Sequence, residues 1–269
     1  MARNISAVAR LTMGVALLAY GASPAAAHEF WIAPKSGVVT PGDTIVGDLM
    51  VGVMLRGNPY PYLPQYVVRF EVTAKGRTES VVGLPGDIPA LSHTVHRAGL
   101  QVIVHQTVPF RATYDDWQLF RQYVVDEGFP EVEALHLKRG LPITGFSERY
   151  TRYVKALVQA GPPQSGDSDL RTGLPFELVA ESNPYQAGLN SLAVRLYWRD
   201  EPAPDVQISI LRDTGTVERR TVRTDKEGRA RIALQAGRYL LSAVRIDPVE
   251  NEPVVWFSHW AALSFIIGK

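Results

Sequence analysis

Residues 229–246 read RARIALQAGRYLLSAVRI and carry the clearest fold signal in the chain. Two β-strands are expected, over residues 229–234 and 239–246, with Ala236 and Gly237 as the turn residues between them. Short strands joined by turn residues are typical of antiparallel β-sandwiches. This stretch therefore predicts a β-rich fold, and the flanking sequence extends the pattern in both directions.

The C-terminal part of the chain repeats this pattern. Turn residues separate seven candidate strands, which cover residues 176–181, 192–198, 206–211, 217–224, 229–234, 239–246 and 254–267. Seven strands in about 95 residues is the density of an immunoglobulin-like sandwich. We therefore expect residues 174–269 to form one such domain. The last run is too polar for a membrane span, because Ser258, His259 and Ser264 would be costly in lipid.

The N-terminal half also alternates like a set of strands. In residues 66–72, Val68, Phe70 and Val72 share one face, and residues 100–107 alternate in the same way. A second β-sandwich domain is expected over residues 28–114. The fold class is therefore mainly β, with two β-sandwich domains joined by a short helical segment.

The expected helical insert covers residues 115–160. Trp117, Phe120 and Val124 follow one another at helical spacing, and a second short helix is expected between Pro130 and Gly140. Residues 126–133 contain four acidic side chains that fit a solvated helix face. Residues 147–159 combine a helix-like start with strand-like alternation, and we expect a helical turn leading into a strand. Residues 161–173 are rich in turn formers and predict an exposed, mobile linker.

The first 27 residues have the three parts of a secretory signal peptide. Arg3 and Arg10 supply positive charge, residues 11–20 form a short apolar run, and Ala25 and Ala27 make an A-x-A cleavage site. Cleavage after Ala27 would lower the net charge from +1 to −1, because two arginines and no acid are lost. A near-neutral chain argues against nucleic-acid binding. We expect a periplasmic protein that is not inserted in a membrane.

Cleavage would also make His28 the first residue of the mature chain. A terminal His offers its α-amine and its imidazole as two nitrogen ligands, which suit nickel, cobalt and copper. The chain contains no cysteine, so further ligands must come from His or carboxylate groups. Glu29 is a candidate to bind the metal or to orient His28. The sequence therefore predicts a divalent-metal site at the mature N-terminus.

The chain contains five other histidines, three of which are candidate ligands. His93 and His96 form an HxxH pair, although three residues apart along a strand means opposite faces. His105 lies on the face of its strand opposite Val102 and Val104 and is a further candidate ligand, although a lone His in a strand is more often an ordinary polar-face or hydrogen-bonded residue. His136 and His259 are expected to have structural roles. Motifs of hydrolases, nucleotide-binding and dinucleotide-binding proteins are missing, and no catalytic residue is predicted.

Five stretches together resemble one known family. They are HEFW at residues 28–31, FRQYVVDEGF at 120–129, ERYTRYVKALVQ at 148–159, GLPFELVAESNPY at 173–185 and WFSHWAALSF at 256–265. The family consists of exported bacterial proteins described as substrate-specific components of nickel or cobalt uptake, with a domain of unknown function. This resemblance implies a metal ion as cargo and a membrane metal transporter as partner.

Two further points qualify this resemblance. Relatives often have a His near the position of Arg245, so a site using that His would be altered here. Residues 224–244 separately resemble transthyretin-like and carboxypeptidase-regulatory modules, which are non-catalytic.

Two alternative functions remain open from the sequence. One is a copper redox protein of the histidine-brace type, and the other is a non-catalytic adhesion or scaffold module.

Overall fold

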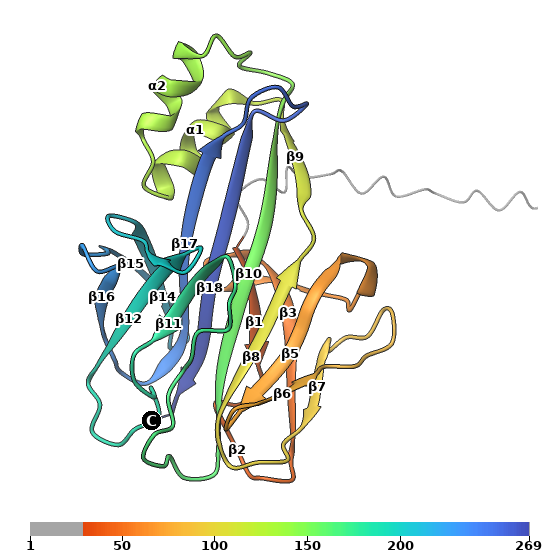
Figure 1. The fold of residues 1–269 in the computed structure, drawn as a ribbon, viewed down its shortest axis with the longest axis vertical. Coiled ribbons are helices and arrows are strands. Elements are labelled where there is room, and N and C mark those ends of the chain that lie inside the picture. The colour runs from red at the N-terminus through yellow and green to blue at the C-terminus, as the bar shows by residue number, and fades with distance from the viewer. Residues whose placement is uncertain (1–28, 269) are drawn as a thin grey trace, which may run out of the picture.

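The computed structural model describes residues 29–268 as three stacked layers of β-sheet (Figure 1). The middle layer is a ten-stranded sheet, and a four-stranded sheet packs on each of its faces. In spatial order the middle sheet runs β15 (Val217–Arg223), β14 (Gln207–Asp213), β17 (Gly237–Pro248), β18 (Trp256–Ile267), β10 (Phe146–Ala160), β8 (Gly99–Thr107), β5 (Val67–Ala74) and β6 (Arg77–Ser80), with β2 (Val38–Val39) and β9 (Phe110–Tyr114) also paired to β10.

The two outer sheets come from different parts of the chain. The N-terminal one contains β1 (Glu29–Pro34), β3 (Thr44–Val53), β4 (Arg56–Tyr60) and β7 (Leu91–Thr94). The C-terminal one contains β11 (Phe176–Ala180), β12 (Ser191–Trp198), β13 (Glu201–Pro202) and β16 (Arg229–Ala233). A 3-10 turn, η1 (Pro64–Tyr66), precedes β5. The predicted mainly β fold is confirmed, and the two sandwiches are fused because both use the middle sheet.

Strand β10 lies at the centre of this arrangement. Val154, Ala156 and Val158 face the core under the N-terminal outer sheet, while Tyr153 and Leu157 face the core under the C-terminal one. A strand that is buried on both faces has a nearly continuous run of apolar residues in its sequence, rather than alternating apolar and polar residues. This explains why residues 147–159 show both helix-like and strand-like patterns in the sequence. The prediction of a helical turn at their start is wrong, because these residues belong to β10.

Long-range pairing joins the two halves of the chain. Strand β10 pairs in parallel with β18, from Glu148 opposite Trp256 to Ala156 opposite Ser264. The predicted division at residues 161–173 therefore does not separate two sheets, because strands from both sides of it belong to the middle one. The predicted helical insert is also shorter than residues 115–160, since its last 15 residues form β10.

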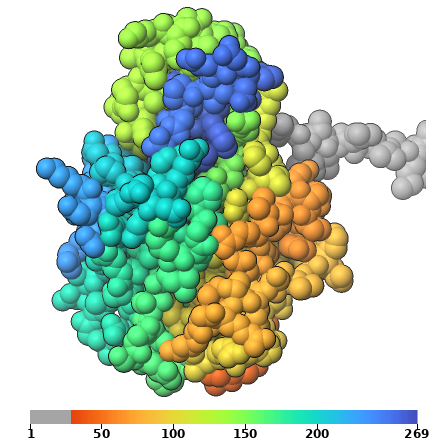
Figure 2. Space-filling view, in the orientation of Figure 1, coloured from red at the N-terminus to blue at the C-terminus, as the bar shows by residue number. Residues whose placement is uncertain are grey.

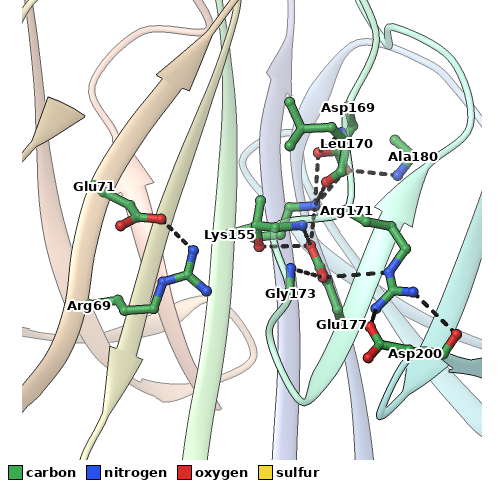
Figure 3. A network of polar contacts seen from close by, with 11 residues as sticks. Arg69, Glu71, Lys155, Asp169, Leu170, Arg171, Gly173, Glu177, Ala180 and Asp200 are labelled. Carbon is green, nitrogen blue, oxygen red and sulfur yellow. Dashed lines mark hydrogen bonds and ion pairs between the residues drawn. The ribbon is translucent and has the colours of Figure 1, made fainter. Parts of the chain in front are cut away.

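Two acidic residues of the predicted linker form ion pairs with lysines of the middle sheet and of the turn after β5. Asp167 and Asp169 are 8% and 6% exposed, so this part of the segment is buried rather than solvated. Lys75 pairs with Asp167. The Lys155 ammonium, on β10, lies 2.8 Å from the Asp169 carboxylate and 3.1 Å from the Glu177 carboxylate (Figure 3). The side chains of Lys155, Asp169 and Glu177 are almost completely buried.

The helices cap one end of the long strands. Helix α1 (Trp117–Asp126) begins at Asp116, whose side chain accepts a hydrogen bond from the Gln118 N–H, and α2 (Glu131–Lys138) follows. Phe120 and Tyr123 from α1 pack against Trp256 and Trp260 from β18. Figure 2 shows this helical cap as a knob beside the loop that joins β17 to β18.

Candidate functional site

The strongest predicted ligand, His28, lies outside the described residues, which begin at its neighbour Glu29. Glu29 starts β1, and its carboxylate accepts a hydrogen bond from the Met54 N–H at 2.9 Å. Burial raises the pKa of Glu29 to about 7, against the opposing effects of that hydrogen bond and of the Arg219 charge. A carboxyl group next to the predicted cleavage site is therefore easier to protonate than an exposed one.

A second acidic side chain, which the sequence places on a solvated helix face, belongs to the same neighbourhood. Glu127 follows α1, and only 15% of its side chain is exposed. Burial raises the pKa of Glu127 to about 7; the Arg219 charge lowers it, and the negative charge of Glu29 raises it. The Arg219 Nη2 lies 4.0 Å from the Glu127 carboxylate and donates to the Asp126 carbonyl at 2.9 Å. Two carboxylates thus share the charge of one guanidinium.

Nothing local in the sequence marks Glu127 as different from its acidic neighbours. It stands in the run DEGF, where Asp126 and Glu127 look equivalent. The difference arises because the end of α1 packs beside β14 and β15, where Gln207 also donates to the Asp126 carbonyl at 2.7 Å. The pairing of Glu29 with Glu127 is therefore a product of tertiary structure.

The two histidines of the HxxH pair do come together. His93 lies in β7 and His96 just after it, where the strand has ended and strict alternation no longer applies. Their Nε2 atoms lie 4.0 Å and 3.8 Å from the same oxygen of Glu79. Arg77 also contacts that carboxylate, at 3.2 Å, so Glu79 already has a cationic partner.

The HxxH pair is distant from Glu29. Along β3, Glu29 lies opposite Gly52, whereas His93 lies opposite Ile45. Seven residues of strand separate these two positions, which corresponds to about 23 Å. The predicted ligands therefore fall into separate groups, with Glu29 at one end of β3 and the HxxH pair at the other.

His105 lies in a third place, within the core under the N-terminal outer sheet. It is 2% exposed, and its ring packs against Phe30 and Phe70 with centroid distances of 5.5 Å and 5.0 Å. Neither ring nitrogen has a hydrogen-bond partner among residues 29–268. Burial and the Arg152 charge lower the pKa of His105 to about 3, so this imidazole is neutral.

The remaining two histidines are both engaged in aromatic packing. His136 accepts a hydrogen bond from the Trp256 indole N–H at 3.0 Å. His259 lies against Phe257 and Trp198, and its Nδ1 is 3.2 Å from the Tyr153 hydroxyl. Arg245 lies opposite His259 on the neighbouring strand.

The segment from the end of β4 to η1, residues 60–66, lies over the region of His105. Tyr60, Leu63 and Tyr66 line a small cavity with His105. Within residues 29–268, no group of three or more His, Cys, Asp or Glu side chains is arranged to hold a metal ion. No helix in that part of the chain is long and apolar enough to cross a membrane.

Comparison with known proteins places the chain in a family without giving it an activity. Curated proteins include no match. Among solved structures, the D0-D1 domain of Intimin is similar at 12% identity over 88% of this chain and 97% of that one, but its TM-score of 0.21 supports no argument. A family model described as a domain of unknown function (DUF4198) matches residues 25–247. The chain therefore belongs to the DUF4198 family.

Proposed function

We propose that this protein is a periplasmic accessory of nickel or cobalt uptake that captures a divalent metal ion at its mature N-terminus. The α-amine and imidazole of His28 would supply two nitrogen ligands, and Glu29 and Glu127 would supply carboxylate oxygens. The ion would then pass to a membrane metal transporter. The signal-peptide pattern that ends at Ala27 and the resemblance to uptake components support this assignment.

The observation that carries the proposal is the pair of half-buried carboxylates beside the predicted cleavage site. Each has a pKa raised to about 7, mainly by burial, and the negative charge of Glu29 raises the pKa of Glu127 further. A divalent cation would stabilise both ionised carboxylates at once. Residue 28 is bonded directly to Glu29, so its Cα lies about 3.8 Å from the Glu29 Cα. In this proposal, two nitrogen atoms from His28 and one carboxylate oxygen each from Glu29 and Glu127 would bind one ion.

Arg219 is the main electrostatic competitor at this position. Its guanidinium lies 4.0 Å from Glu127 and would repel a bound cation. It also donates to the Asp126 carbonyl and to the Ser209 hydroxyl, at 2.9 Å and 3.0 Å, which hold it against the sheet. This competition favours moderate rather than very tight binding, which suits a carrier that must release its ion.

The test is calorimetric titration of the mature protein, beginning at His28, with Ni²⁺, Co²⁺ and Cu²⁺. We expect one ion per chain, with copper bound more tightly than nickel and nickel more tightly than cobalt. Binding should release protons at pH 7, because the α-amine and both carboxyl groups are partly protonated there. The proton release is measured by repeating the titration in buffers of different ionisation enthalpy.

Three matched variants locate the site. One extra residue before His28 removes the amine from the chelate, and Glu29→Gln removes one oxygen ligand; each should weaken binding about tenfold or more, a difference of about 1.4 kcal/mol. His96→Ala, in the separate group around Glu79, should leave the affinity unchanged. Equal affinity in the mature and extended forms, or loss of binding only in His96→Ala, would refute the N-terminal site.

A further inference from the structure

A second candidate site is an open cleft on the face of the middle sheet that the C-terminal outer sheet covers. Phe30 and Glu29 belong to the N-terminal outer sheet, on the other face. The cleft lies between β10 and β18 on one side and the turn joining β12 to β13 on the other, and its volume is about 450 Å³. Tyr153 and His259 contribute to its lining, as do Trp198, Arg199 and Phe257. Residues from both halves of the chain therefore meet in this cleft.

His259 provides a neutral hydrogen-bonding group in the cleft. Burial and the charges of nearby arginines lower its pKa to about 4, although Asp247 opposes this effect. The ring is fixed by Phe257 and Trp198, whose centroids lie 4.1 Å and 4.5 Å away. When the Tyr153 hydroxyl donates to Nδ1, the single imidazole proton lies on Nε2. Asp247 is 4.0 Å from that atom, too far for a hydrogen bond, so the Nε2 proton is available to a ligand.

Arg199 provides the positive charge. It forms no ion pair within the described residues, and its guanidinium lies 4.9 Å from the centroid of the Trp198 ring. Arg199 and Asp200 have φ values of 47° and 73°, a left-handed conformation that is unfavourable for residues with a side chain. The Arg199 N–H donates to the Pro175 carbonyl at 2.8 Å, and Arg171 pairs with the Asp200 carboxylate. These contacts hold the strained turn and fix the place of Arg199.

The other nearby arginines are already neutralised. Arg245 binds the Asp247 carboxylate through two hydrogen bonds of 2.9 Å and 2.6 Å, and Arg149 lies 3.0 Å from Glu252. The lining also contains Asp200, whose carboxylate pairs with Arg171, so Arg199 is the arginine of this lining that has no carboxylate partner within residues 29–268. Apolar surface from Phe257, Leu174 and Pro175 lies in the same lining.

We propose that this cleft binds a small organic carboxylate. Its carboxylate group would pair with Arg199 and accept a hydrogen bond from His259, and its apolar part would lie against Phe257 and Pro175. An anion is favoured over a cation because the unpaired charge is an arginine and the histidine is a neutral donor. A charge-assisted hydrogen bond to a guanidinium is about twice as strong as one between neutral groups, so the uncharged analogue should bind more weakly.

The test uses benzoate and its neutral analogue benzamide as probes, followed by ligand-observed saturation-transfer NMR in the presence of EDTA. Benzoate should bind to the full mature chain at millimolar concentration, and benzamide about tenfold more weakly or worse. Arg199→Gln should weaken benzoate binding to a similar extent. Arg231→Gln, which removes an exposed arginine from β16, should not change it. Circular dichroism of each variant checks that the fold is retained.

Three results would overturn the proposal. They are no benzoate binding, equal binding of benzoate and benzamide, and unchanged benzoate binding in correctly folded Arg199→Gln. Displacement of benzoate by inorganic phosphate as readily as by acetate would also overturn it, because the cleft would then be a general anion site. Since EDTA removes divalent ions, the result does not depend on the metal site proposed above.

Discussion

Replacing Lys155 with methionine should destabilise the protein strongly, because this lysine neutralises two buried carboxylates. Its ammonium bonds to Asp169, to Glu177 and to the Leu170 carbonyl, and all three charged side chains are at most 1% exposed (Figure 3). Removing one partner of a buried ion pair typically costs about 3 to 5 kcal/mol, since the remaining charge is left without compensation.

The remaining contacts set where in that range the loss should fall. Asp169 still accepts hydrogen bonds from the N–H groups of Leu170 and Ala180. Glu177 still accepts from the Thr172 N–H and hydroxyl and from the Gly173 N–H. These donors partly compensate each carboxylate, so we expect the lower end, about 3 kcal/mol. For a chain of this size, that loss corresponds to a fall in Tm of about 6 to 12 °C.

Urea unfolding followed by circular dichroism measures this change, with Lys35→Met as the matched control. Lys35 pairs with Asp48, but 60% of its side chain is exposed, so its loss should cost at most about 1 kcal/mol. The triple variant Lys155→Met, Asp169→Asn, Glu177→Gln should be more stable than Lys155→Met, because it leaves none of these three positions charged. A cost below about 1 kcal/mol for Lys155→Met would refute the reasoning, since a buried carboxylate pair would then not need its cation.

Two further predictions concern buried polar groups. Glu148 accepts hydrogen bonds from Tyr114, Tyr123 and Ser258, and burial raises its pKa to about 7. A carboxyl group whose folded-state pKa is raised favours folding at low pH, and this contribution of up to about 3 kcal/mol is lost as pH rises from about 4.5 through 7. Urea titrations at pH 5 and pH 8 should show this loss in the native chain and a smaller one in Glu148→Gln; an equal loss in both would contradict it. His105→Phe should raise the free energy of unfolding by about 1 kcal/mol, because the ring lies between Phe30 and Phe70 and its nitrogens have no hydrogen-bond partner in the part of the chain that the structure describes. His136→Phe is the control and should lower Tm, since it breaks the hydrogen bonds to Trp256 and to the Pro142 carbonyl. A fall in Tm for His105→Phe would contradict the prediction and would indicate a partner or ligand that this histidine needs.

Local sequence patterns predicted the strand content of this protein. The alternation in residues 66–72 and 100–107 became β5 and β8, and residues 239–246 lie within β17. Helix α1 was also predicted, from the helical spacing of Phe120 and Val124, which lie on its buried face. These features depend on contacts between residues that are close in the sequence. The periodicity of apolar residues and the residues at helix ends therefore indicate them directly.

The candidate ligands were only partly predictable. The sequence identified Glu29, His93, His96 and His105 as a possible set, and the structure separates them into three places. It could not identify Glu127, because an acidic residue after a helix looks the same whether it is solvated or lies beside Arg219. Electrostatic neighbourhoods depend on which elements pack together, and a single sequence carries no direct measure of that packing.

The sequence by itself determined the mainly β character and the positions of most strands. Only the tertiary structure decided that both predicted sandwiches share one sheet, through the parallel pairing of β10 with β18. It also decided that Asp169, in a predicted linker, is buried against Lys155. The physical reason is the same for both: these contacts join residues far apart in the chain, and their free energy comes from burial and charge pairing that no local pattern encodes.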